Sequence, residues 1–183
     1  MEIRSATLED AAVIGAIYRP YVTDSCVSFE LQPPIDAVMA ERIAEILPQL
    51  PWLVCEIDGR ICGYAYAARH RDRPAYQWGA ETSVYVAASW HRRGVARRLY
   101  EALFERLVEQ GYYTAFAGIT LPNAASVGLH SSFGFEPVGV YRNAGFKHGR
   151  WWDVGWWQKA LRPYEAPLGA PIPRARISLR MRG

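Results

Sequence analysis

The segment Val84–Leu107 reads VYVAASWHRRGVARRLYEALFERL. Its first residues are typical of a strand, and Val95, Leu99 and Leu103 recur every four residues, which predicts an amphipathic helix. The turn between strand and helix holds one glycine and is rich in arginine. A helix N-terminus exposes unpaired N–H groups and the positive end of the helix dipole, so cations gathered there are repelled unless an anion is bound. The segment therefore predicts a strand–turn–helix unit that binds a polyanion.

The turn itself suits a diphosphate. We expect the N–H groups of residues 92–97 to hold it, because Gly94 permits close approach of the backbone and Ala96 keeps the next position small. The simple alternative is that the arginines only solvate a helix face, since an isolated RRGVA is a weak signal. The phosphate-binding motifs GxxxxGK[ST] and GxGxxG after a strand are both missing from the sequence. Any phosphate held here is therefore bound by a different backbone arrangement.

Length and composition indicate a single globular domain. The 183 residues are 50% hydrophobic and 13% aromatic, far from a disordered composition. No apolar run approaches the roughly 20 residues needed to cross a bilayer, and the N-terminal MEIRSATLED lacks the apolar segment of a secretion signal. The three cysteines have no metal-ligand spacing, and their odd number argues against a disulfide framework. We therefore expect a cytoplasmic protein that holds no metal.

Apolar periodicity and turn residues predict the element order β-α-α-β-β-β-α-β-α-β-β. A capping box at Thr7–Asp10 begins the first helix, which we expect to end before Pro20, and Asp58-Gly59 closes a hairpin. Strands are expected at about residues 3–5, 52–57, 60–66, 82–86, 113–119, 135–141 and 151–161. Hairpins mixed with strand–helix–strand units indicate an α/β fold, with a mixed, mostly antiparallel sheet flanked by helices on both faces.

Charge is unevenly distributed along the chain. Residues 163–183 contain four arginines and one glutamate, which accounts for the whole formal net charge of +3 and leaves residues 1–162 neutral. That segment also holds four of the twelve prolines. We therefore expect one domain at residues 1–162 and a Pro/Arg-rich, extended and flexible C-terminal extension at residues 163–183. A basic tail can hold nucleic acid, but a neutral body offers no basic face for it, so no nucleic-acid partner is expected.

The turn His91-Arg-Arg-Gly94-Val-Ala96, between strand and helix, resembles the R/Q-x-x-G-x-G/A pyrophosphate loop of the GNAT N-acetyltransferases. AETSVYVAASWHRRG, GITLPNAASVGLHSSFGF and YRNAGFKHGRWWDVGWWQ resemble the phosphinothricin/methionine sulfoximine N-acetyltransferase subfamily in order and spacing. The likeness covers about residues 3–162. It implies the GNAT acyl-CoA N-acyltransferase fold and acetyl-CoA as co-substrate. It also implies acetyl transfer to the α-amine of a small amino-acid analogue by direct attack in a ternary complex, without membrane or metal.

The resemblance implies two catalytic residues. Acetyl transfer from a thioester requires deprotonation of the amine, stabilisation of the carbonyl oxygen and departure of the thiolate. Glu81 matches a glutamate regarded as catalytic in the subfamily, although by itself it is typical of a surface carboxylate. His130 stands where many GNAT enzymes carry a tyrosine that protonates the thiolate and where the subfamily has histidine. A neutral imidazole can relay a proton near pH 7, but a lone histidine is more often a packed polar residue.

A cofactor site along the strand and turn is also implied. Main-chain groups of the strand bind the pantetheine arm, the turn binds the diphosphate, and an N–H near Val86 meets the oxyanion. Asn123 matches a cofactor-contacting asparagine and equally fits a simple N-cap, with Ser126 in the first turn of the helix. The expected cofactor-binding residues are Val84, Tyr85, Val86, Arg92, Arg93, Gly94, Val95, Ala96, Arg97, Asn123 and Ser126.

The acceptor is expected to carry a carboxylate and a second oxygen-rich group, which suit positive side chains. The expected substrate-binding residues are Phe29, Glu30, Arg71, Arg73, Lys147 and His148, with surface solvation the alternative for Arg71. Homologous enzymes place this site beside a dimer interface, so a homodimer is expected and the WWDVGWW stretch is a candidate subunit contact. These tryptophans could equally cover the core, although strand alternation cannot bury all of them on one face.

Four positions depart from the family pattern: His91 in the turn, Ala96 for the usual glycine, Ser131 after the histidine, and Trp152 for the histidine of WHDVG.

Two other functions stay open. The same fold could acetylate a protein N-terminus, a polyamine or an aminoglycoside, although arginine-rich loops disfavour a polycation. A non-catalytic acyl-CoA sensor, or a nucleic-acid binder that uses the tail, would not need Glu81.

Overall fold

The structure, a computed structural model, describes residues 1–180. The strands are β1 (Glu2–Ser5), β2 (Trp52–Ile57), β3 (Arg60–Arg69), β4 (Gly79–Val86), β5 (Thr114–Leu121), β6 (Glu136–Lys147) and β7 (Arg150–Ala160). The helices are α1 (Ala11–Thr23), α2 (Asp36–Ile46), α3 (Val95–Gln110), α4 (Ala124–Ser132) and α5 (Arg174–Arg180), with short 3-10 turns at Leu8–Asp10, Pro74–Tyr76 and Ala88–Trp90. Among residues 1–180, no helix combines the length and the apolar character that a membrane span requires.

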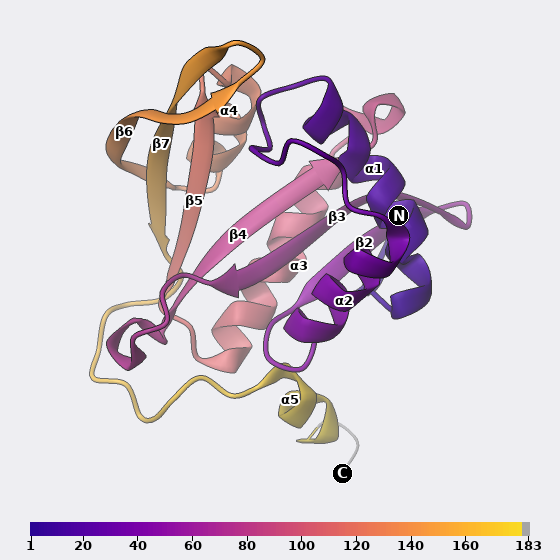
Figure 1. Cartoon of the computed structure of the whole chain (residues 1–183). Coiled ribbons are helices and arrows are strands. Elements are labelled where there is room, and N and C mark those ends of the chain that lie inside the picture. The colour runs from indigo at the N-terminus through magenta and orange to yellow at the C-terminus, as the bar shows by residue number, and fades with distance from the viewer. Residues whose placement is uncertain (181–183) are drawn as a thin grey trace.

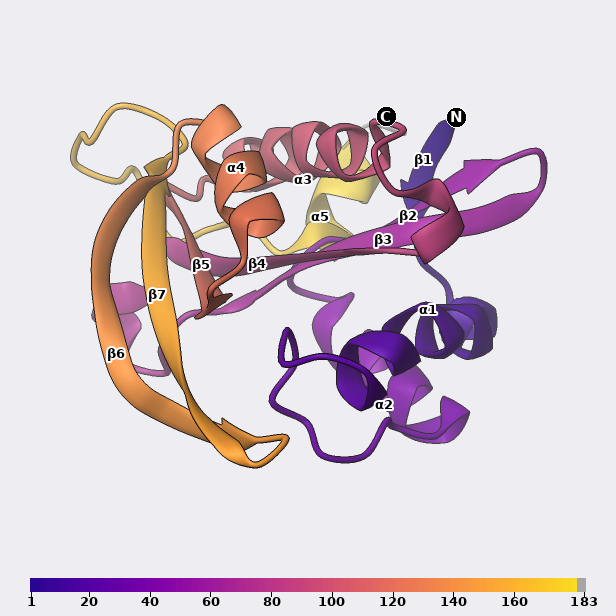
Figure 2. The ribbon, with the colours of Figure 1, turned by 90° about the horizontal axis from the view of Figure 1, so that it is seen from above.

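The strands form one sheet in the order β1-β2-β3-β4-β5-β7-β6. Helices α1 and α2 cover one face, and α3 and α4 cover the other (Figures 1 and 2). Every neighbouring pair of strands is antiparallel except β4 and β5, which are parallel. The predicted α/β architecture with a mixed, mostly antiparallel sheet is therefore confirmed.

The sheet has an apolar core on each face. Successive side chains of a strand point to opposite faces, so Leu53 packs with Leu99 on the α3 face while Val54 packs with Ile14 and Ile43 on the α1/α2 face. Burying a side chain of this size contributes about 1.5–3 kcal/mol to folding. The continuous apolar run in β2 is thus explained by burial on both faces.

Helix α1 runs past Pro20, which the sequence predicted as its end. Proline removes one N–H from the helical ladder, yet Val22 beyond it is buried and the Tyr21 hydroxyl donates to Val86 O at 2.6 Å. These tertiary contacts hold the last turn of the helix in place. At the other end, the Asp10 carboxylate accepts the Thr7 N–H at 2.8 Å, as the predicted capping box requires.

The hairpin of β6 and β7 is longer than predicted. Strand β6 continues through residues 142–147, and His148 and Gly149 form the turn with φ of +50° and +77°. Pairing with β7 shifts register between Tyr141 and Gly145. The glycine-containing RNAGFKHGR segment therefore forms an irregular strand and a tight turn, not a loop. In β7, Trp157 is buried in the core, whereas Trp151, next to the hairpin turn, is 60% exposed, so the tryptophans do not all cover one core.

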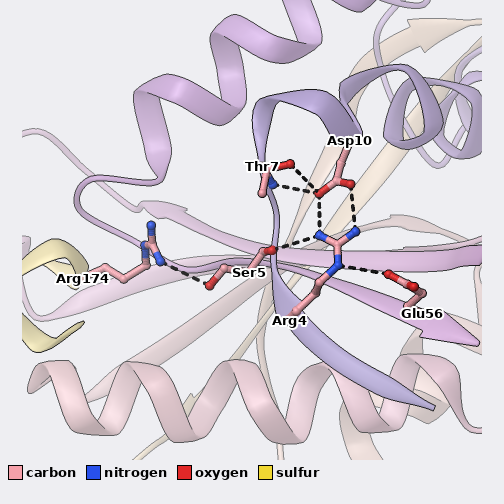
Figure 3. A network of polar contacts seen from close by, with 6 residues as sticks. All are labelled: Arg4, Ser5, Thr7, Asp10, Glu56 and Arg174. Carbon is pink, nitrogen blue, oxygen red and sulfur yellow. Dashed lines mark hydrogen bonds and ion pairs between the residues drawn. The ribbon is translucent and has the colours of Figure 1, made fainter. Parts of the chain in front are cut away.

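A polar network joins β1 to its neighbours (Figure 3). The Arg4 guanidinium donates to Asp10 Oδ2 at 2.7 Å and Oδ1 at 2.9 Å, and its Nε donates to Glu56 Oε2 at 3.1 Å. The hydrogen bonds from Arg4 hold the pKa of Asp10 below its ordinary value. The network ties the first helical turn to β1 and β2.

Residues 163–180 return to the body of the protein. Arg174 donates from Nε to Leu47 O at 2.7 Å, just after α2, and from Nη1 to Ser5 Oγ at 3.2 Å (Figure 3). Gln110 Nε2 donates to Ile172 O at 2.9 Å. Residues 163–173 contain no helix or strand, and α5 and these contacts were not predicted. The flexibility of the extension stays a prediction, and residues 181–183 lie outside the described residues.

We expect removal of residues 163–183 to lower the free energy of unfolding by about 1–3 kcal/mol. The reason is that the buried amide of Gln110 and the carbonyl of Leu47 would lose hydrogen-bond partners. Urea denaturation of the full and shortened chains measures the difference, and removal of residues 181–183 alone is the control. An unchanged unfolding midpoint in the shortened chain would mean that these contacts add no net stability.

Candidate functional site

The parallel strands β4 and β5 separate midway, which opens a gap in the middle of the sheet (Figure 1). They pair only over residues 79–81 and 114–116, although β4 runs to Val86 and β5 to Leu121. At the point of separation, Thr82 Oγ1 donates to Phe116 O at 3.2 Å. Beyond it, a cleft is lined by residues of β4, β5 and α4.

Val84 and Val86 direct their main-chain polar groups into this gap. Ala87 N–H donates to Cys62 O on the β3 side, and hydrogen-bonded pairs alternate along an antiparallel ladder, so the main-chain groups of Tyr85 pair with β3. The Tyr21 hydroxyl contacts Val86 N at 3.3 Å and Val86 O at 2.6 Å, so the main-chain groups of Val86 do point away from β3. The main-chain groups of Tyr85 are therefore not available to a cofactor, contrary to the expectation. Only the side chain of Tyr85 could contact one.

The turn of residues 92–97 presents unpaired N–H groups. Arg92 and Gly94 have φ of +60° and +81°, both in the left-handed region, and such turns gather successive N–H groups into an anion-binding concavity. Within residues 1–180 these N–H groups have no hydrogen-bond acceptor, while the next one, of Arg98, donates to Gly94 O at 3.0 Å. A Cβ added to Gly94 would meet no atom within 4 Å, so the turn is open to a ligand.

The four arginines at this turn are not equivalent. The Arg97 guanidinium lies over the Phe133 ring at 5.1 Å, and Arg98 pairs with a glutamate one turn further along α3 at 3.6 Å. Arg92 and Arg93 are exposed and form no ion pair within the described part of the chain, although the Arg93 guanidinium lies over the Trp90 ring at 5.1 Å. Both remain accessible to an anion in the turn. Arg92 is the one of the four without a charged or aromatic partner among the described residues.

His91 lies on the wall of the gap. Its Nε2 is 2.9 Å from Val86 O and 3.1 Å from the Tyr21 hydroxyl. An apolar groove continues from here between α1 and the turn, and its lining includes Val13 and Ile17. His91 is thus engaged with β4 and α1, which explains how the turn accommodates a histidine.

His130 on α4 is 4% exposed and lies beside the gap. Its Nδ1 is 2.8 Å from Ser126 O, and its Nε2 is 3.0 Å from the Tyr100 hydroxyl. A carbonyl only accepts, so Nδ1 carries the hydrogen and Nε2 accepts from Tyr100. Burial lowers the pKa of His130, so the ring is neutral at pH 7.

Tyr100 was missed by the sequence analysis, because its place in the apolar stripe of α3 is typical of a core residue. Tyr100 and His130 line the same cleft as Val84 and Asn123. Asn123 Oδ1 accepts the Ser126 N–H at 3.0 Å, so the simple N-cap interpretation is confirmed. Its additional contact with a cofactor stays a prediction.

Glu81 occupies the last paired position of β4 before the gap. Its Oε1 lies 2.9 Å from His70 Nδ1, and its Oε2 has no hydrogen-bond partner within residues 1–180. The side chain is 37% exposed, and alternation places it on the same face as Ser83 and Tyr85. The carboxylate therefore has one oxygen held and one oxygen free at the narrow end of the gap.

Four of the predicted acceptor residues lie near this face or at its edge. Arg71 and Arg73 are exposed, without an ion pair in the described chain, in the loop that leads to β4. The Phe29 ring lies against Gly145 of β6, in the space that a Cβ would fill. His148 sits at the hairpin turn, where its Nε2 is 3.3 Å from Ser25 O.

Lys147 and Glu30 have structural partners instead. Lys147 is 4% exposed, and its Nζ donates to Val22 O at 2.6 Å and Ser28 O at 2.7 Å; burial lowers its pKa. Glu30 accepts two hydrogen bonds from Arg42, at 2.7 and 3.1 Å. Although burial opposes ionisation, these bonds hold the pKa of Glu30 below its ordinary value. The structure thus corrects the expectation that these two charged groups face the acceptor.

Several groups suited to transfer chemistry converge on the gap. A carboxylate lies on one side, a neutral histidine with a tyrosine hydroxyl lies on the other, and main-chain donors line the strand between them. Within residues 1–180, no group of three His, Cys, Asp or Glu side chains is placed to hold a metal ion.

Comparison with known proteins agrees with this geometry. The family model described as "Acetyltransferase (GNAT) domain" matches residues 3–156. Phosphinothricin N-acetyltransferase of Streptomyces viridochromogenes is 38% identical over 167 residues, which cover 91% of this chain and 90% of that protein. L-methionine sulfoximine/L-methionine sulfone acetyltransferase of Salmonella typhimurium is 33% identical over 168 residues, covering 91% and 98% respectively.

A solved structure is similar over nearly the same span. The GNAT superfamily phosphinothricin acetyltransferase from Sinorhizobium meliloti, in complex with AcCoA, superposes with a TM-score of 0.85. It is 32% identical in sequence, and the match covers 91% of this chain and 95% of that one.

Proposed function

This chain belongs to the GNAT acetyltransferase family, and from that premise we propose that it moves the acetyl group of acetyl-CoA to the α-amine of a small amino-acid analogue. The proposed acceptors are of the phosphinothricin, methionine sulfoximine or methionine sulfone type, as in its relatives. One observation carries the proposal: β4 and β5 separate beside a turn of unpaired N–H groups, with Glu81 at the point of separation.

The gap and turn suit the two ends of acetyl-CoA. The diphosphate would be held by the N–H groups of residues 92–97 with Arg92 and Arg93, and the pantetheine arm by main-chain groups of Val84, which lines the cleft, and by those of Val86 once Tyr21 and His91 release them. With the diphosphate at the turn and the pantetheine arm along β4, the thioester would lie toward the narrow end of the gap. Val86 N–H is engaged by Tyr21 in this structure, whereas Val84 N–H has no acceptor within residues 1–180. We therefore favour Val84 N–H as the donor to the developing oxyanion.

Glu81 and His130 supply the proton transfers. Glu81 Oε2 takes a proton from the acceptor ammonium, directly or through water, and the amine nitrogen then attacks the thioester carbonyl carbon. Collapse of the tetrahedral intermediate breaks the C–S bond, the nitrogen gives up its second proton, and the thiolate takes up one proton. His130 Nε2 carries no hydrogen in this arrangement, so it would act as that acid only after taking up the proton released by the nitrogen, through the Tyr100 hydroxyl.

The acceptor site and subunit contact follow from the same geometry. Arg71 and Arg73 would bind the carboxylate and the second acidic group of the acceptor, and Phe29 would form one wall. Strand β6 is one of the two edges of the sheet, and it leaves apolar side chains exposed, among them Val138 and Tyr141. An uncovered edge of this kind pairs readily with another chain, which supports a homodimer.

Acceptor identity is tested by a panel in a free-thiol assay with acetyl-CoA. We expect turnover on phosphinothricin, methionine sulfoximine or methionine sulfone, because exposed arginines flank the face that carries Glu81. A polyamine and an aminoglycoside are the cationic controls, and we expect neither to be acetylated. Activity on a peptide N-terminus alone would favour the alternative, a GNAT acetyltransferase of protein N-termini or other amines. Binding of acetyl-CoA without turnover on any amine would favour a sensor.

A further inference from the structure

His70 is the first residue after β3, and its ring reaches Glu81 on the neighbouring strand β4. The distance from Nδ1 to Glu81 Oε1 is 2.9 Å, and the histidine side chain is only 12% exposed. An ionised carboxylate has no hydrogen to donate, so Nδ1 carries the hydrogen in this contact. No local sequence pattern points to His70, because it lies in the polar stretch ARHRDR and is brought to Glu81 only by strand pairing.

Three aromatic side chains fix the His70 ring. Phe116 lies nearly parallel to it, at 18° and 4.0 Å between centroids, and Tyr76 and Trp156 meet it edge-on at 6.1 Å each. Phe116 can occupy this place because Gly79 has no side chain, since a Cβ there would lie 2.7 Å from Phe116 Cε2. The imidazole is therefore oriented by packing before any ligand binds.

Glu81 has no hydrogen-bond partner other than His70 within residues 1–180. A glutamate side chain has several rotatable bonds, and ordering it costs conformational entropy unless a neighbour holds it. A general base acts only within hydrogen-bond reach of the proton that it removes. A fixed donor on Oε1 leaves Oε2 as the oxygen that can meet the acceptor amine.

We propose that His70 is a positioning residue for Glu81. Its Nδ1–H holds Oε1, so that Oε2 faces the amine of the acceptor in the orientation that proton removal requires. This inference rests on the proposed role of Glu81 as the base. His70 touches neither the acceptor nor acetyl-CoA, and it acts only through the carboxylate.

Two substitutions of His70 separate the effect of its Nδ1–H donor from the effect of its aromatic ring. His70→Phe keeps a ring on Phe116 and removes the N–H, whereas His70→Asn loses the ring and returns an amide N–H near the position of Nδ1. We expect His70→Phe to lower kcat about 10- to 100-fold, with the KM for acetyl-CoA unchanged, and His70→Asn to recover a large part of kcat. Wild-type kcat in His70→Phe overturns the proposal. Equal loss in both variants also overturns it, because the ring and not the donor would then matter.

A double-mutant cycle distinguishes this inference from the proposed function. If His70 acts through Glu81, His70→Phe has no further effect on kcat once Glu81 is replaced by glutamine. If His70→Phe lowers kcat by the same factor in the wild-type and Glu81→Gln backgrounds, the positioning role is overturned while Glu81 remains the base. Wild-type turnover in Glu81→Gln alone overturns the base itself, and with it the premise of this inference. Thermal unfolding of each variant identifies any loss of folded protein.

Discussion

Replacing Glu81 with glutamine is expected to lower kcat by about 10²- to 10⁴-fold, the usual contribution of a positioned general base. The amide keeps the size of the side chain and can still contact His70, but it cannot take a proton from the acceptor ammonium. The carboxylate lies on the opposite side of β4 from Thr82 and Val84, so the acetyl-CoA site is untouched. We therefore expect the KM for acetyl-CoA to stay within about twofold.

Steady-state kinetics, with the concentrations of both substrates varied, measures the change in kcat separately from the change in the KM for acetyl-CoA. Glu109→Gln is the matched control, because Glu109 is an exposed glutamate at the C-terminal end of α3, the end opposite to the turn of residues 92–97. Unchanged kcat in Glu81→Gln would remove this residue as the base. A large rise in the KM for acetyl-CoA would instead place the carboxylate beside the cofactor.

Gly94→Asp is expected to raise the KM for acetyl-CoA by tenfold or more, where each tenfold step corresponds to about 1.4 kcal/mol. Gly94 lies at the centre of the turn with unpaired N–H groups, and its Cβ position is open. A carboxylate there would occupy the N–H groups and repel the diphosphate. The effect should shrink as ionic strength rises, because salt screens exposed charges.

Gly94→Asn is the matched control for this change. Asparagine and aspartate have nearly the same shape, and both tolerate the left-handed region in which Gly94 lies, at φ +81°. The pair therefore differs mainly in charge, and we expect the asparagine variant to change KM far less. Equal effects of the two substitutions would point to backbone strain. An unchanged KM in both would mean that the diphosphate is held elsewhere.

Local signals predicted the parts of the fold in which backbone conformation depends on residue type. Asp58 and Gly59 have φ of +49° and +72° in the predicted hairpin. Each of these positions needs a left-handed backbone, which glycine and aspartate adopt most readily. Gly94 belongs to the same group, so the turn that carries the proposed diphosphate site was also predictable.

Residues whose roles depend on distant partners were not predictable. Lys147 is typical of an exposed cation in the sequence GFKHG, and only the fold brings the carbonyls of Val22 and Ser28 to its ammonium group. His70 meets Glu81 because β3 and β4 pair, and Tyr100 meets His130 because α3 and α4 are neighbours. In each case a contact between elements, which no local pattern encodes, decides what the side chain does.

The two hydrogen bonds of Lys147 couple the last turn of α1 and the loop of residues 24–30 to β6, at one edge of the sheet. Phe29 in that loop rests on Gly145 of β6, so its ring cannot shift without the strand. If a second copy of the chain covered β6, as proposed, it would contact the strand on which Phe29, one proposed wall of the acceptor site, rests. Quaternary assembly and substrate selectivity would thus be mechanically linked, and interface mutations far from Glu81 would alter which amines are acetylated.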